Sequence, residues 1–296
     1  MDLENTLYKI DAPLDIDMRS VYMDRDIIFL DNVKSLRTPD TIKLKMNFIV
    51  FCSCGRIQAD INGEHTEIHN GQILICPPGL AISNIMVSPE FEFQALGITN
   101  NALQMFLRSY MTVWNQFIYV QQSYTIDSNR ADMSFYDKMC SLIRMCLLKT
   151  NDETEKKYRT EIFKSLLSGC LIGLCNMVRK QTIDTENTPM HNTPLFNQFL
   201  DLLQNTEQKH QTVEYYASRL CITPKYLTVI CKKNSAKTAV EWITEYTLAD
   251  ITHYIRNTPL SIKEISNKIG FPNTSFFGKY VKDHFGCTPI EYRKQQ

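Results

Sequence analysis

Apolar and polar residues alternate with the two-residue period of β-strands through the first third of the chain. Segment 44–52 alternates most clearly and becomes apolar on both sides toward its end, as in a strand that enters a closed barrel. Asn62-Gly63 and Asn70-Gly71 are typical of tight β-hairpin turns. Further strands are predicted at 27–30, 56–61, 65–68, 72–76 and 91–98. Short strands separated by such turns predict a small barrel or sandwich over residues 1–125.

Helical periodicity begins near Ala102. Apolar stripes spaced by three and four residues predict helices over 131–148 and 158–180, which would form a hairpin within 126–182. Gly169 and Gly173 lie on the second stripe and would let another helix approach closely. The polar segment 183–193, which contains Pro189, predicts an interdomain linker before a helical domain at 194–296.

Segment 270–293 predicts a turn, a helix, a second turn and the start of another helix. Asn273 and Thr274 are favourable N-cap residues, and Gly286 is a typical helix end. The predicted apolar face of this helix comprises Phe276, Phe277, Tyr280, Val281, His284 and Phe285. The predicted outward face comprises Thr274, Ser275, Gly278, Lys279 and Lys282. A short cationic helix backed by aromatic residues fits a DNA major groove, although an ordinary amphipathic surface helix has the same pattern.

The same pattern occurs twice, which favours the DNA-binding interpretation. A shift of 50 positions superimposes residues of an earlier segment on this one, including Leu227 on Phe277, Lys232 on Lys282, Thr238 on Thr288 and Glu241 on Glu291. Before the turn the shift is 49 positions, so the turn in the second copy is one residue longer. The matches include polar positions, and they predict two helix-turn-helix units joined by a longer helix over 238–255. If both units enter successive major grooves, their reading helices must lie about 34 Å apart.

These segments resemble the AraC/XylS family of bacterial transcription regulators over about 195–293. The best-matching residues are Ile265, Gly270-Phe271, Phe276-Phe277, Lys282, Phe285-Gly286, Thr288-Pro289 and Glu291-Tyr292-Arg293. The resemblance implies that two helices bind adjacent major-groove segments of double-stranded promoter DNA. The DNA-binding residues implied by position or adjacency are Lys225, Tyr226, Thr228, Val229, Lys232, Lys233, Asn273, Thr274, Ser275, Gly278, Lys279 and Lys282.

Two of these positions depart from the family. Val229 replaces an arginine that is common there, and Gly278 replaces a serine or threonine. Valine cannot form a bidentate contact with guanine, though it can touch a thymine methyl group. We therefore expect the second helix to be the stronger reader, with Lys279 in direct base contact. Lys232, Lys233 and Lys282 suit phosphate contacts, which position the protein without specifying sequence.

Charge is distributed unevenly along a chain whose net charge is zero. From Pro194 onward 13 basic residues face 9 acidic ones, a balance of +4, and the preceding residues therefore have a balance of −4. A basic C-terminal domain beside an acidic N-terminal one is typical of a DNA-binding module with a separate sensor.

The N-terminal residues have no apolar core run and do not predict a signal peptide. The apolar run 166–175 is too short to span a bilayer, so we expect a cytoplasmic protein without a membrane partner. The ten cysteines lie mostly in apolar periodic segments, as reduced cytosolic thiols do. Cys52 and Cys54 would share one face of a strand, which leaves a metal or redox pair as an open alternative.

Segment 59–79 resembles a cupin barrel, the sensor fold common in the AraC/XylS family. Gly71, Pro77 and Gly79 match the second cupin motif, but Ile82 replaces the metal-binding histidine. His65 and His69 do not replace the paired histidines of the first motif, because they lie four apart on a hairpin, and we predict neither a metal nor a cofactor. Candidate residues for a ligand pocket inside the barrel are Met46, Phe48, Val50, Ile57, Ile75 and Phe93. Alternatively, these side chains simply fill the core.

The family resemblance also implies that the helical hairpin forms a homodimer. The residues predicted for that contact are Ile162, Leu166, Gly169 and Gly173. Packing of this stripe within the chain is the alternative, since any amphipathic helix needs a partner.

The sequence therefore predicts an α+β protein of two domains: a cupin-like N-terminal β-barrel with a helical hairpin, and an all-α C-terminal domain with two helix-turn-helix units. The expected function is sequence-specific transcription regulation under the control of a small effector, with RNA polymerase as a partner if the protein is an activator. One alternative is a metal-dependent cupin enzyme with an appended DNA-binding domain. Another is a ligand-independent regulator whose barrel only dimerises.

Overall fold

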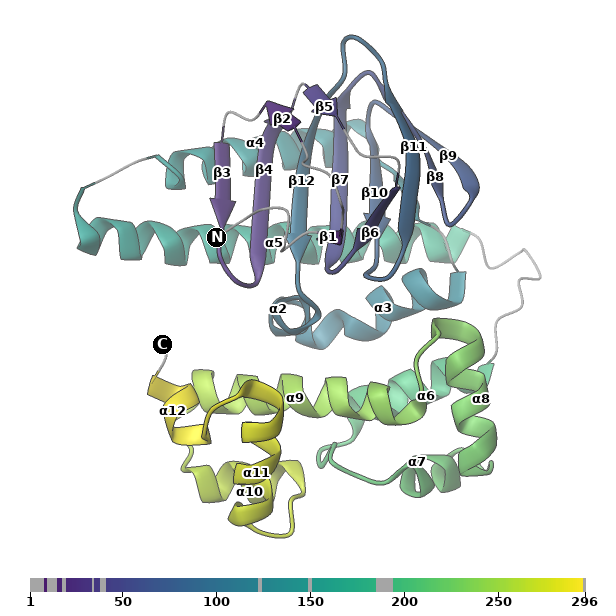
Figure 1. The fold of residues 1–296 in the computed structure, drawn as a ribbon, viewed down its shortest axis with the longest axis vertical. Coiled ribbons are helices and arrows are strands. Elements are labelled where there is room, and N and C mark those ends of the chain that lie inside the picture. The colour runs from purple at the N-terminus through teal and green to yellow at the C-terminus, as the bar shows by residue number, and fades with distance from the viewer. Residues whose placement is uncertain are drawn as a thin grey trace. The chain divides into compact units, whose positions relative to one another are not determined.

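The computed structural model describes residues 8–9, 15–17, 20–33, 35–37, 41–121, 124–148, 151–184 and 194–294. By its contacts the chain divides into two compact units (Figure 1). The first unit comprises Met1–Leu107 and Gln122–Thr188, and the second comprises Arg108–Gln121 and Pro189–Gln296. The short segment 108–121, which the sequence pattern assigned to the sensor, thus packs with the C-terminal helices. Of the predicted linker, residues 185–193 lie outside the described residues.

The first unit is built on antiparallel sheets. The six-stranded sheet has the order β13 (Thr125–Asp127), β10 (Gln72–Cys76), β7 (Asn47–Cys54), β12 (Glu92–Ile98), β4 (Ile27–Val33) and β3 (Ser20–Met23). The five-stranded sheet has the order β1 (Tyr8–Lys9), β6 (Thr41–Leu44), β11 (Ala81–Val87), β8 (Arg56–Ile61) and β9 (Glu64–His69). A short ribbon pairs β2 (Asp15–Asp17) with β5 (Ser35–Arg37). No hydrogen-bonded ladder joins the two large sheets within the described residues, so the predicted closed barrel is here a pair of open sheets.

Alternating side chains of the two large sheets form one apolar core. Met46, Val50, Ile57 and Phe93 belong to it, and the half-buried Phe48 packs against it. These five residues point inward as predicted, and they pack together as core residues do. Ile75 was also predicted to point into the barrel, and that prediction is wrong because its side chain lies on the other face of the sheet. Ile75 pairs directly with Ile49, whose side chain lies on the opposite, helix-covered face of the sheet.

Cys52 and Cys54 do not share a face, contrary to the sequence prediction. Phe93 pairs with Cys52 while Glu92 pairs with Cys54, so β7 has one extra residue at this point, as in a β-bulge. Cys52 is buried, with its thiol directed at the backbone oxygens of Cys54 and Gly55, whereas Cys54 is exposed. The local shift in register therefore separates the two thiols.

Helices α4 (Arg130–Cys146) and α5 (Glu153–Asp184) lie across the outer face of the six-stranded sheet (Figure 1). Asn129 caps α4 in a capping box with Asp132. The ring of Phe163 packs on Tyr22 and Phe29, with centroids 4.3 and 6.4 Å apart. A third helix, α2 (Asn100–Phe106), comes after β12 and is capped by Thr99.

The two helices of the hairpin approach each other at glycines. A Cβ atom on Gly173 would lie 3.1 Å from the ring of Phe135, and one on Gly169 would lie 3.4 Å from Met139. Gly169 and Gly173 therefore face α4 of the same chain. This contact corresponds to packing of the stripe within the chain, the alternative to a dimer contact. Ile162 is exposed and Leu166 is half-buried.

Helix α5 is longer than the pattern predicted. Residues Glu153–Gln181 are long and apolar enough to cross a membrane by length and composition alone. One face of this helix, however, is buried against the sheet, including Phe163, Leu167, Leu171 and Val178, each at most 2% exposed. Burial of this kind is typical of a core helix.

The second unit is entirely helical. It begins with η1 (Arg108–Tyr110), α3 (Met111–Asn115) and the π-helical η2 (Gln116–Gln121). It continues with α6 (Pro194–Asn205), α7 (Val213–Arg219), α8 (Pro224–Ser235), α9 (Ala239–Asn257), α10 (Ile262–Ile269), α11 (Thr274–Phe285) and α12 (Pro289–Lys294). Within this unit α3 packs on α6, and η2 packs on α8. Trp242 of α9 anchors the contact, with its ring 5.3 Å from Tyr119 and 5.9 Å from Phe196.

Candidate nucleic-acid interface

The first helix pair of the second unit consists of α7, a turn and α8. Thr223 caps α8 by accepting a hydrogen bond from the Tyr226 amide at 3.2 Å, and Pro224 occupies the first helical turn, where its missing N–H costs nothing. The turn contains Cys221 at φ 55°, and α8 ends at Ala236 at φ 58°. Both residues adopt the left-handed region without being glycine, so this pair stores backbone strain.

The second pair consists of α10, a turn and α11. Asn273 caps α11, and its side-chain oxygen accepts hydrogen bonds from the amides of Ser275 and Phe276, both at 3.0 Å. The two left-handed positions are here glycines, Gly270 at φ 99° and Gly286 at φ 75°. Glycine adopts this conformation without a steric penalty, so the second pair lacks the strain of the first.

Two of the polar matches of the sequence repeat, Thr238 on Thr288 and Glu241 on Glu291, form helix caps. Thr238 and Glu241 form a capping box at the start of α9. Thr288 and Glu291 exchange the same bonds at α12, at 2.7 Å from the Thr288 amide to the Glu291 carboxylate and 3.3 Å in return. The hydrogen bonds from the cap residue hold the pKa of both carboxyls below their usual range. A capping box thus starts the helix that follows α8 and the helix that follows α11.

The predicted DNA-binding residues fall into two groups by exposure. Most side chains are exposed, namely Lys225, Tyr226, Val229, Lys232 and Lys233 on α8, and Asn273, Thr274, Ser275, Lys279 and Lys282 at α11. Thr228 and Gly278 are half-buried. The Thr228 hydroxyl donates to the Pro224 carbonyl at 3.1 Å, and the Asn273 oxygen caps α11. These two groups are therefore already engaged in local hydrogen bonds.

Phe276 was assigned to the apolar backing of α11, and that prediction is wrong. Its side chain is 62% exposed, whereas Phe277 and Val281 are fully buried. Because successive residues of a helix differ by about 100°, Phe276 lies on the flank of the buried face rather than within it. It borders a surface hollow with Lys279 and Asp283. The helical phase set by Phe277 and Val281 could have located it from the sequence.

A buried polar cluster supports the long helix α9. Asp250 is 3% exposed and pairs with Arg108 at 2.9 Å and with Lys209 at 3.7 Å. The Lys209 ammonium also donates to the carbonyls of Gln204 and Thr206 at 3.0 and 2.9 Å. Burial raises the pKa of the Asp250 carboxyl and lowers the pKa of Lys209. Sequence analysis did not identify this cluster, because its three charged residues are far apart in the chain.

The histidines and Ile82, which we compared with the cupin motifs, are not arranged as metal ligands. His65 and His69 are exposed on β9, with His65 3.3 Å from Asp60 and His69 3.9 Å from Glu67. Ile82 is a buried core residue of β11. Across the described ranges there is no group of three or more His, Cys, Asp or Glu residues placed to hold a metal ion.

Comparison with known proteins supports the assignment of the second unit. Residues 216–295 match a family model described as a helix-turn-helix domain. The chain is 29% identical over 99 residues to the Msm operon regulatory protein of Streptococcus mutans, covering 33% of this chain and 36% of that protein. It is 30% identical over 94 residues to the lactose operon transcription activator of Staphylococcus xylosus, covering 32% and 34%. The matched part thus spans about a third of the length of these relatives.

Among solved structures, wild-type ToxT of Vibrio cholerae with a bound unsaturated fatty acid matches 93% of this chain and 97% of its own chain. The sequence identity is 16% and the TM-score is 0.35, so this match carries no information about an effector of this chain. The helix-turn-helix match and the curated relatives together show that the C-terminal part of this chain carries a helix-turn-helix domain of the kind found in AraC/XylS-type transcription regulators.

Proposed function

We propose that this protein is a sequence-specific transcription regulator that binds promoter DNA with α8 and α11. The observation that carries the proposal is the pair of exposed cationic helices inside the segment that matches a helix-turn-helix domain. Helix α9, which joins the pair α7–α8 to the pair α10–α11, has 19 residues. A helix of that length extends about 28 Å, comparable to the roughly 34 Å between successive major grooves.

The two helices differ in what they can contribute to specificity. Helix α11 presents Ser275 and Lys279, which can donate hydrogen bonds to base edges. Helix α8 presents Val229, which is 52% exposed and can contact a thymine methyl group. Lys232, Lys233 and Lys282 serve phosphate contacts. We therefore expect α11 to dominate base recognition and α8 to add affinity and a preference for A·T-rich sequence.

Fluorescence anisotropy of the full chain on promoter duplexes from its own genome tests the proposal. We expect salt-sensitive binding with a preference for some promoters over random duplex. Equal affinity for all sequences at every salt concentration would refute sequence-specific regulation. The full chain is the appropriate sample, because residues 108–121 form part of the DNA-binding unit.

Effector control requires a connection between sensor and reader, and the chain itself supplies one. Segment 108–121 comes directly after α2 of the first unit, yet it packs within the second. In that unit the Asn115 amide donates to the Tyr246 hydroxyl at 3.0 Å, and the Gln204 amide donates to the Arg108 carbonyl at 2.6 Å. A ligand that favours one arrangement of the first unit would shift this segment. That shift would change the packing of η2 against α8.

A cytoplasmic homodimer is the form in which we expect the regulator to act, with RNA polymerase as a further partner if it activates transcription. Exposed apolar residues on the hairpin support this form, including Tyr158 and Ile162 on α5 and Met145 on α4. The alternative of a metal-dependent enzyme is checked by elemental analysis of the purified protein. Stoichiometric iron, zinc or manganese would favour that alternative over the regulator alone.

A further inference from the structure

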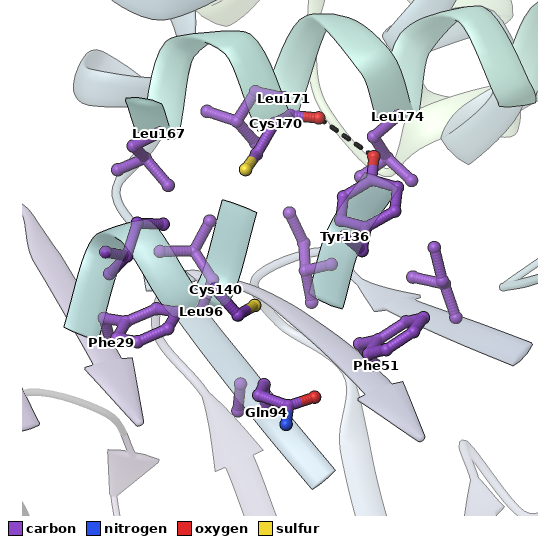
Figure 2. A pocket seen from close by; sticks show the side chains of 14 residues that line it. Phe29, Phe51, Gln94, Leu96, Tyr136, Cys140, Leu167, Cys170, Leu171 and Leu174 are labelled. Atoms are coloured by element: carbon purple, nitrogen blue, oxygen red, sulfur yellow. Dashed lines mark hydrogen bonds between the residues drawn. The ribbon is translucent and has the colours of Figure 1, made fainter. Parts of the chain in front are cut away.

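The first unit contains a cavity between the six-stranded sheet and the helical hairpin, on the face opposite the core between the sheets. Its volume is about 60 Å³. Phe29, Phe51 and Leu96 line it from the sheet, and Tyr136, Cys140 and Leu174 line it from the helices (Figure 2). It is distinct from the ligand pocket that the sequence predicted inside the barrel, where the candidate side chains pack as core.

One amide side chain is buried at this apolar site. Gln94 of β12 is 7% exposed and lines the cavity, on the sheet side of Figure 2. Its side-chain oxygen is buried and has no hydrogen-bond partner among the described residues. A buried acceptor without a donor is costly and rare in native proteins, so its presence calls for an explanation. A ligand with a hydroxyl or N–H group would supply the missing donor.

The remaining polar groups of the lining are uncharged or already engaged. Burial raises the pKa of the Cys140 and Cys170 thiols to about 12, so both are neutral at physiological pH. The Tyr136 hydroxyl donates to the Cys170 carbonyl at 2.9 Å, which links α4 to α5 across the cavity (Figure 2). A site of this kind disfavours a charged ligand, because no opposite charge lines it to offset the loss of hydration.

We propose that this cavity binds a small neutral molecule, mostly apolar, whose hydroxyl or N–H group donates to Gln94. A water-sized group needs at least about 15 Å³ and occupies about 30 Å³ in the liquid, so 60 Å³ accommodates about two to four non-hydrogen atoms. Short-chain alcohols have this size and polarity. The ligand's role as the effector rests on the proposed regulatory function, whereas its binding does not.

Methyl NMR of the full chain, labelled at isoleucine, tests the site with 1-propanol as the probe. Ile49, Ile73 and Ile143 line the cavity and report binding, while Ile251 and Ile255 of the second unit serve as internal controls. We expect saturable shifts at the three lining residues only. The matched probe 1-chloropropane has similar shape but no donor, and we expect it to bind about fivefold more weakly, as loss of one hydrogen bond predicts.

Variants separate the polar contact from the cavity itself. Gln94→Leu should weaken 1-propanol binding about fivefold and leave 1-chloropropane binding unchanged. Gln104→Leu is the control, since Gln104 is an equally buried glutamine with an unpartnered oxygen that does not line the cavity. Cys140→Leu should fill the cavity and abolish binding of both probes.

Three results would overturn the proposal. These are shifts that do not saturate, shifts of equal size at Ile251, and an unchanged 1-propanol affinity in Gln94→Leu. Anisotropy with promoter DNA and 1-propanol then tests the effector role separately. Binding of 1-propanol without any change in DNA affinity would remove the effector role and keep the site. A chain that binds 1-propanol but never DNA would refute the proposed function alone.

Discussion

Lys279 and Lys282 lie on the exposed side of α11, and we assign them different contacts with DNA. Replacing Lys279 with alanine should cost about 1–3 kcal/mol on the preferred promoter and relax specificity at one base step. Replacing Lys282 should weaken binding to all sequences alike and reduce the salt slope by about one. Anisotropy titrations on specific and random duplexes over a range of salt concentrations measure both effects. Equal effects of the two substitutions would contradict the assignment.

Phe276 lies on the same helix as the two lysines, and its side chain is exposed. An exposed phenylalanine beside Lys279 can pack against a thymine methyl group or a sugar, or it can be neutral for DNA binding. Its exposure could have been predicted, because the fully buried Phe277 and Val281 fix the phase of α11. Ile75 was misplaced for the same reason, since a shift by one residue moves a strand side chain to the other face.

The left-handed residues that end α8 and α11 predict opposite effects of reciprocal substitutions. Ala236→Gly should stabilise the second unit by about 0.5–1 kcal/mol, because alanine at positive φ is strained and glycine is not. Gly286→Ala should destabilise it by about 1 kcal/mol. A Cβ atom on Gly286 meets no other atom within 4 Å, so its effect is conformational rather than steric. Chemical denaturation of the full chain measures both, and effects of the same sign would refute the strain argument.

At the scale of elements, the capping carboxylates make the helices of the second unit sensitive to acid. Glu241, Glu264 and Glu291 accept hydrogen bonds from their N-cap residues, which lower the pKa of each carboxyl. A group whose folded-state pKa is lowered contributes stability above its unfolded pKa, which is about 4.3 for glutamate, and loses it as pH falls through the folded-state pKa. Thermal stability should therefore drop below about pH 4.

The triple substitution of these glutamates by glutamine isolates that contribution. The variant should show a smaller loss of melting temperature between pH 5 and pH 3 than the unmodified chain, since glutamine does not titrate. Asp250 acts in the opposite direction, because burial raises the pKa of its carboxyl. Asp250 is present in both the unmodified chain and the variant, so the difference between their melting temperatures still measures the contribution of the caps. Parallel curves would show that the caps do not contribute to the acid response.

The helices of the second unit were predictable because local sequence specifies their ends. Thr223, Thr238, Ser261 and Asn273 are side-chain caps directly before their helices, and apolar periodicity defines the helix after each cap. The open pair of sheets was not predictable, since barrel closure depends on ladders between distant strands. Segment 108–121 was misassigned for a similar reason. Its place depends on contacts such as Asn115 with Tyr246, which no local pattern encodes.

At the scale of the whole molecule, we expect the hairpin of α4 and α5 to determine whether the protein is a monomer or a dimer. The glycine stripe serves the contact between α4 and α5, so a partner chain must use other residues. Tyr158 and Ile162 are 67% and 51% exposed on α5, and Leu142 and Met145 are 45% and 62% exposed on α4. Single exposed apolar residues are ordinary on a protein surface, and these four are the ones that the proposed dimer contact would bury.

Ile162→Glu should therefore convert the expected homodimer into a monomer. In a two-fold interface each residue occurs twice, so the substitution removes two buried apolar side chains and introduces two like charges. We expect the dimer dissociation constant to rise about 100-fold or more. Sedimentation equilibrium measures this change, with Met86→Glu as the control, because Met86 is 58% exposed on β11 away from the hairpin. An unchanged dimer in Ile162→Glu would show that the interface does not include Ile162, and a monomeric unmodified chain would show that the hairpin does not join two copies.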